Sequence, residues 1–122
     1  MAEKLSARQL AQLVVLEPLP ARFQQIHRLI EEIAGLRADE SVVRRLCRIL
    51  DEAKAATNTV GLTALSDTMG VMGTMARRNA GMQMKIRGLR EGLGSLKVNY
   101  EGALRSAKVP LPPNAGNPPI VA

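Results

Sequence analysis

The chain has 122 residues, of which 46% are hydrophobic and only 2% aromatic, and its 17 Lys and Arg against 11 Asp and Glu give a formal charge of +6. This length predicts one domain, and the scarcity of aromatic residues argues against a β-sandwich or barrel, because strands favour aromatic and β-branched side chains. A single Cys and a single His argue against a disulfide, a zinc site and a Ser-His-Asp triad, so we expect no metal, cofactor or catalytic residue.

The apolar runs of the chain are short, such as Leu13–Leu16. A membrane-spanning helix needs about 20 apolar residues in succession. The N-terminus also lacks the apolar core of a signal peptide. We therefore expect a cytoplasmic protein that does not enter a membrane and keeps Cys47 as a reduced thiol.

The first two helices are predicted from capping residues and from apolar spacing. Ser6 and Gln9 form a capping box that opens a short helix to about Leu16. The segment Glu17-Pro18-Leu19-Pro20 breaks this helix, and Pro20 suits the first turn of a second one, which ends near Gly35. Its buried stripe follows three- and four-residue steps and consists of Phe23, Ile26, Ile30 and Ile33.

The third helix is expected to begin after Asp39 and to carry two faces. Its apolar stripe consists of Val42, Val43, Leu46, Ile49, Leu50, Ala53 and Ala56. Its opposite stripe consists of Arg44, Arg48, Asp51, either Lys54 or Ala55, and Asn58. A turn is predicted over residues 57–61. The fourth helix then directs inward Leu62, Leu65, Met69, Met72 and Met75.

The fifth helix follows a turn at residues 79–81 and has the longest apolar pattern: Met82, Ile86, Leu89, Leu93, Leu96, Tyr100 and Ala103. Gly88, Gly92 and Gly94 weaken this helix, so they predict a kink or a close helix contact. Residues 108–122 hold five of the seven prolines, which predicts an extended or flexible tail. The fold expected for residues 1–107 is an all-α, antiparallel four-helix bundle with a short extra N-terminal helix.

The excess positive charge is confined to one part of the chain. Residues 1–76 hold nine Lys and Arg against nine Asp and Glu, whereas residues 77–108 hold eight against two. Such a basic segment is typical of nucleic-acid binding, of docking to an acidic protein, or of a solvated helix face. The candidate basic residues are Arg77, Arg78, Lys85, Arg87 and Arg90.

Residues 50–65 carry a short motif in which Lys54 precedes small residues and a Gly-Leu pair that opens the next helix. This order resembles the core of a histidine phosphotransfer domain, in which a helix carries His, then Lys three residues later, then Gly and small residues. Lys54 matches the Lys of the family, Ala55 stands in place of the Gly, and Ala56–Leu62 match the turn. The order of the helices agrees over about residues 5–107.

The acceptor histidine of that family falls on Asp51 in this chain. A carboxylate there lacks the imidazole nitrogen that accepts a phosphoryl group, and the methyl of Ala55 projects toward an approaching partner. The resemblance therefore implies the fold and the partner but argues against phosphotransfer. It implies a receiver domain or a histidine kinase as the partner.

The leading interpretation is a non-catalytic adaptor in two-component or chemotaxis-type signalling of the bacterial kind. Its docking face would consist of Arg44, Arg48, Asp51, Lys54 and Asn58, and the arginines would complement the acidic pocket of a receiver domain. The competing interpretation of Asp51 and Lys54 is an ordinary exposed ion pair between residues three apart. His27, beside the stripe of the second helix, is expected to be partly packed and partly exposed.

Two alternatives to the adaptor remain open at the level of the sequence. The basic segment could bind nucleic acid through phosphate contacts, although Tyr100 is the one side chain there that could stack on a base. The seam from Met82 to Ala103 could instead join two copies of the chain in a homodimer.

Overall fold

A computed structural model describes residues 4–35, 40–78 and 81–110, and within them the chain forms helices and no strand. The helices are α1 (Ala7–Leu16), α2 (Leu19–Ala34), α3 (Glu40–Thr59), α4 (Thr63–Arg77) and α5 (Met82–Lys108). The all-α prediction is confirmed. None of the described helices is both long enough and apolar enough to cross a membrane. The expected N-cap Asp39 and most of the proline-rich segment, residues 111–122, lie outside the described residues.

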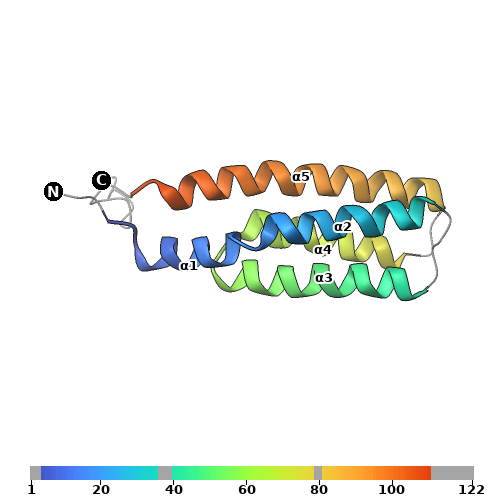
Figure 1. The fold of residues 1–122 in the computed structure, drawn as a ribbon, viewed down its shortest axis with the longest axis horizontal. Coiled ribbons are helices and arrows are strands. Elements are labelled where there is room, and N and C mark those ends of the chain that lie inside the picture. The colour runs from blue at the N-terminus through green and yellow to red at the C-terminus, as the bar shows by residue number, and fades with distance from the viewer. Residues whose placement is uncertain (1–3, 36–39, 79–80, 111–122) are drawn as a thin grey trace, which may run out of the picture.

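Four helices pack together around the core. α2 contacts α3 and α5, and α4 contacts the same two helices, so each of the four has two neighbours. Figure 1 shows that α5 runs the full length of the molecule and that α1 lies at the end where α3 meets α4. The core residues that are completely buried come from every helix and include Leu16, Ile26, Leu46, Met72 and Leu96.

The predicted capping box at α1 is present and has a second role. The Ser6 hydroxyl accepts a hydrogen bond from the Gln9 backbone at 3.0 Å, and the Gln9 side-chain oxygen accepts one from the Ser6 backbone at 2.9 Å. The Gln9 amide nitrogen then donates to the carbonyls of Ser106 and Val109 at 3.1 and 2.6 Å. Gln9 is 4% exposed, so one buried side chain caps α1 and holds the end of α5.

The prediction for α2 is confirmed in its start, its stripe and its end. Pro20 lies in the first turn and Gly35 is the C-cap residue. Phe23 is buried and meets Tyr100 of α5 edge-to-face, with ring centroids 5.7 Å apart and an interplanar angle of 88°. This geometry is a favourable one for aromatic pairs, and it joins α2 to α5.

The end of α3 differs from the prediction. The helix continues to Thr59, so the turn is shorter than residues 57–61, and Ala56 is exposed whereas Cys47 and Thr57 are buried. The Thr57 hydroxyl donates to the Ala53 carbonyl at 2.8 Å and so satisfies its own polar group inside the helix. This bond makes a threonine compatible with a buried helical position that sequence patterns treat as a turn.

The connection from α3 to α4 depends on Gly61. Its φ angle is +77°, a conformation that is costly for residues with a Cβ atom. The backbone N–H of Leu62 donates to the Thr57 carbonyl at 2.9 Å. This turn brings Leu62 back into the core, where it is 9% exposed.

The glycines of α5 produce the close helix contact that the sequence suggested. A Cβ atom on Gly92 would lie 2.6 Å from Met72 Cγ of α4, and a Cβ atom on Gly88 would collide with Met75. A Cβ atom on Gly94 meets nothing within 4 Å. At the start of α5 the prediction is wrong for Met82, which is exposed, as is the neighbouring Met84, because the first turn of α5 lies beyond the buried part of α4.

Gly92→Ala is expected to destabilise the protein relative to Gly94→Ala by about 1–3 kcal/mol, the usual effect of overpacking a filled core. Met72 is 1% exposed, and its Cγ atom, close to the backbone of α4, is the atom that the added methyl would meet. Gly94→Ala is the matched control, because it adds the same methyl to the same helix in open space and gains about 1 kcal/mol of helix propensity. Urea unfolding of the two variants measures the difference. Equal midpoints for the two would contradict the close contact between α4 and α5.

Candidate functional site

The predicted docking face forms a continuous exposed stripe along α3. All of its members are exposed, and they follow the three- and four-residue steps of one helix face: Arg44, Arg48, Asp51, Lys54 and Asn58. Arg44 forms an ion pair with Glu40 one turn earlier, at 3.3 Å. Arg48 borders a shallow hollow between α2 and α3. The stripe therefore offers cationic side chains from the α2 side of α3 to its α4 side.

Asp51 is held by α4 and not by Lys54. Its carboxylate accepts a hydrogen bond from the guanidinium of Arg77 at 2.6 Å. About half of each side chain is exposed, 56% for Asp51 and 52% for Arg77. The position that matches the acceptor histidine thus carries a carboxylate already paired with a cation. Arg77 was placed among the basic residues by sequence, but its link to Asp51 across two helices was missed.

Lys54 lies across a glycine of α4. Its Nζ atom is 3.2 Å from the point where a Cβ atom on Gly70 would lie. One turn later, a Cβ atom on Gly73 would lie 3.1 Å from a guanidinium nitrogen of Arg77 and 3.9 Å from a carboxylate oxygen of Asp51. The two glycines therefore leave room for the long side chains of Lys54 and Arg77 to lie across the surface of α4. The spacing of Gly70 and Gly73 was a signal that sequence analysis did not use.

The basic residues divide between two helices. Arg77 is in the last turn of α4 and Arg78 is its C-cap residue, whereas Lys85, Arg87 and Arg90 lie on α5. Arg87 pairs with Glu91 at 3.5 Å, and Arg90 pairs with Glu31 of α2 at 2.9 Å. Of the five candidate basic residues, three are therefore in ion pairs, and Arg78 and Lys85 form none with another described residue.

The pair of Arg90 and Glu31 is bidentate. Arg90 Nε donates to one carboxylate oxygen of Glu31 at 3.2 Å, and a second guanidinium nitrogen donates to the other at 2.9 Å. These hydrogen bonds lower the pKa of Glu31 below its ordinary value and raise that of Arg90. The geometry is the one in which arginine binds carboxylates most strongly, and it links the exposed surfaces of α5 and α2.

Cys47 on α3 has a buried thiol. Burial is the main cause that raises its pKa, and the nearby Arg77 opposes this effect. A thiol held in its neutral form is a poor nucleophile and a poor metal ligand. Within the described part of the chain, no group of three or more His, Cys, Asp and Glu residues is arranged to hold a metal ion.

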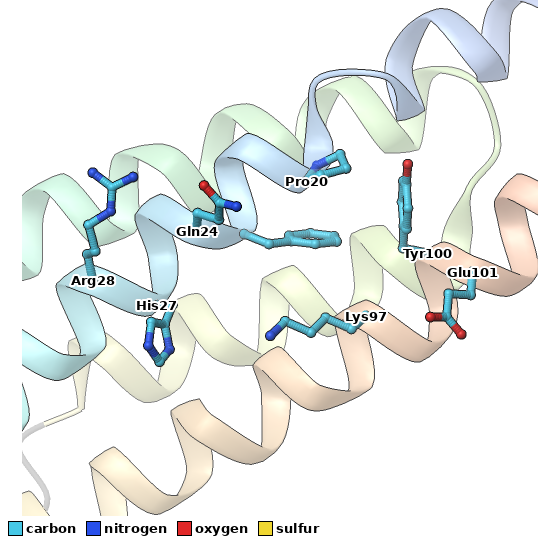
Figure 2. Close-up of a pocket in the computed structure, with 8 residues that line it drawn as sticks. Pro20, Gln24, His27, Arg28, Lys97, Tyr100 and Glu101 are labelled. Atoms are coloured by element: carbon cyan, nitrogen blue, oxygen red, sulfur yellow. The ribbon is translucent and has the colours of Figure 1, made fainter.

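A second surface feature, which sequence analysis did not anticipate, is a groove between α2 and α5. Its volume is about 510 Å³. Figure 2 shows Pro20 and Tyr100 at one end of this groove, with Lys97 extended along α5 toward His27 and Arg28 directed away. His27 is exposed rather than partly packed. The groove is lined by Pro20, Phe23, Gln24, His27, Arg28, Lys97, Tyr100 and Glu101.

Comparisons with known proteins give no match: neither a family model, nor a curated protein, nor a solved structure resembles the chain significantly. The resemblance to histidine phosphotransfer domains accordingly stays a prediction from the residues of α3 and α4.

Arg90→Gln is expected to raise the pKa of Glu31 toward that of an ordinary glutamate, because it removes the hydrogen bonds to the carboxylate. A lowered pKa in the folded state stabilises the protein above the ordinary glutamate pKa, and this contribution is lost as the pH falls through the lowered value. The free energy of unfolding of the variant should therefore depend less on pH in this acidic range. NMR titration of the Glu31 carboxyl measures the shift. Arg87→Gln, which removes the pair with Glu91 instead, should leave Glu31 unchanged, and an equal shift in both variants would contradict the assignment.

Proposed function

We propose that this chain is a non-catalytic signalling adaptor that binds an acidic receiver domain through the exposed face of α3. In this proposal α2 to α5 form an antiparallel four-helix bundle of the histidine phosphotransfer type, with α1 as an extra helix, in the cytoplasm. The single observation that carries it is the exposed, mainly cationic stripe of α3, in which Asp51 at the matching acceptor position is paired with Arg77 of α4 at 2.6 Å.

The charges of this face support binding to an acidic partner. Arg48 and Lys54 make no ion pair with another described residue, and Arg44 pairs only with an exposed Glu40 at 3.3 Å. The one acidic member, Asp51, is paired with Arg77. The repulsion between Asp51 and an acidic partner surface is therefore weaker than it would be for an unpaired carboxylate. Complementary charges of this kind increase the association rate and specificity of a complex.

The same residues support binding without phosphotransfer. The nucleophile in a phosphotransfer domain is an imidazole nitrogen, and residue 51 is a carboxylate whose oxygen accepts a 2.6 Å hydrogen bond from Arg77. An oxygen engaged in this way is poorly placed to attack phosphorus, and a carboxylate is a weak base at neutral pH. A receiver domain would thus be held at its phosphorylation pocket and keep its phosphoryl group.

Reversal of two charges on this face tests the binding proposal. The double variant Arg44→Glu with Arg48→Glu is expected to weaken receiver binding about tenfold or more, equivalent to about 1.4 kcal/mol. Both side chains are exposed, so the fold should be unaffected. Calorimetric titration with a panel of receiver domains measures the affinity.

The matched control is Lys85→Glu with Arg87→Glu on α5. It changes the net charge by the same amount, but both residues are on α5 and outside the docking face, so receiver binding should fall little. A larger loss in this control would contradict the docking face. If the protein instead binds DNA or RNA with a steep salt dependence that the α5 variant abolishes, the nucleic-acid alternative is correct.

A second test introduces the histidine that phosphotransfer requires. Asp51→His together with Ala55→Gly is expected to accept a phosphoryl group from a phosphorylated receiver, because it places an imidazole one turn before Lys54 and beside Arg77. The measurement is transfer of radioactive phosphate to the protein. Ala55→Gly alone is the control and should remain unlabelled. Label on His27 of the unmodified protein would contradict the adaptor proposal and indicate a phosphotransferase.

A further inference from the structure

The groove between α2 and α5 has an apolar floor and a polar rim. Phe23 at its floor is 4% exposed and supports Tyr100 through their edge-to-face contact, 5.7 Å between centroids. Figure 2 shows the Tyr100 ring standing opposite Pro20 across this end of the groove. Aromatic side chains arranged in this way are the usual binding surface for proline-rich segments in the polyproline II conformation.

The rim supplies hydrogen-bond donors that have no partner among the described residues. The Gln24 amide, the Lys97 ammonium and the Tyr100 hydroxyl all border the groove. A polyproline II segment has carbonyl groups free to accept hydrogen bonds, because its backbone forms none internally. The groove therefore offers donors to a backbone that carries mainly acceptors.

The chain itself contains a segment of that chemistry. Residues 111–122 hold two Pro-Pro pairs, Pro112-Pro113 and Pro118-Pro119, and no charged residue. An uncharged segment suits a groove whose rim includes both Lys97 and Glu101, whereas a strongly acidic or basic ligand would meet a like charge there.

The point at which the segment leaves the fold is fixed. The Gln9 amide binds the Val109 carbonyl at 2.6 Å, which holds the last described turn of α5 against α1. Tyr100 lies nine residues before Val109 on the helix, or about 14 Å at 1.5 Å per residue. Pro113 is four residues beyond Val109 and Pro118 is nine, which correspond to about 12 Å and 28 Å at 3.1 Å per residue. The second proline pair has the length to return to Tyr100, and the first does not.

We propose that Pro118 and Pro119 of the same chain bind in the groove between α2 and α5, against Tyr100. This contact is independent of the proposed function, because the residues that line the groove come from α2 and α5 and none from α3 or α4. It would cover the groove and leave the docking face of α3 accessible.

The chain provides its own probe for this contact, since Tyr100 is its single Tyr and Trp is absent. Quenching of tyrosine fluorescence by acrylamide in the full chain reports directly on the exposure of the Tyr100 ring. Pro118→Ala with Pro119→Ala is expected to increase the quenching constant roughly twofold, because a proline ring stacked on tyrosine covers one of its two faces.

Pro112→Ala with Pro113→Ala is the matched control, with the same chemical change in the same segment, and should leave the quenching constant unchanged. Equal quenching in the parent and in both variants would overturn the proposal, as would an equal increase in the two variants. Quenching that rises on dilution of the parent would overturn it in favour of a segment from a second copy. The variants do not alter the described helices, so an unchanged circular dichroism spectrum is expected for each.

Discussion

The distance at which α4 packs against its two neighbours is the constraint on which the rest of the molecule depends. Toward α5 this distance is set by Gly92, where an added Cβ would lie 2.6 Å from Met72. Toward α3 it is set by small buried residues, Ala53 and Thr57 on α3 and Ser66 and Gly73 on α4. Dense packing transmits any added volume to its surroundings. A bulkier residue at these positions would separate the helices and would also displace the surface groups that rest on them.

The candidate docking face is a consequence of this packing. Because Gly70 and Gly73 have no side chain, the side chains of Lys54 and Arg77 can lie over α4 instead of projecting away from it. Arg77 then reaches Asp51 on the neighbouring helix at 2.6 Å. An exposed ion pair of this kind contributes little to stability. Its importance lies in the position of the charges, since it places a cation beside Asp51, the residue that we predict to correspond to the acceptor histidine of phosphotransfer domains.

The sequence was sufficient to predict what depends on local chemistry and periodicity. The capping box of Ser6, the break over residues 17–20, the stripe of α2 and the central part of the α5 stripe, Leu89 to Leu96, follow from such signals, and the structure agrees with them. The burial of Thr57 could not be predicted in this way, because it depends on a hydroxyl that bonds to its own helix. The pairing of Asp51 with Arg77 and the groove beside Tyr100 depend on contacts between distant segments, which a single sequence does not specify.

The two candidate surfaces use different pairs of helices, and this separation has a physical consequence. The docking face is built by α3 with support from α4, and the groove by α2 with α5. Two sites that share no residue influence each other only through a change in the scaffold between them. The scaffold here is a close-packed core in which Ile26, Leu50 and Leu96 are fully buried. A ligand in the groove can therefore alter the α3 face by shifting α2 relative to α3, or α5 relative to α4, since these are the contacts that join the two surfaces. Without such a shift, occupation of one surface would leave the other unchanged.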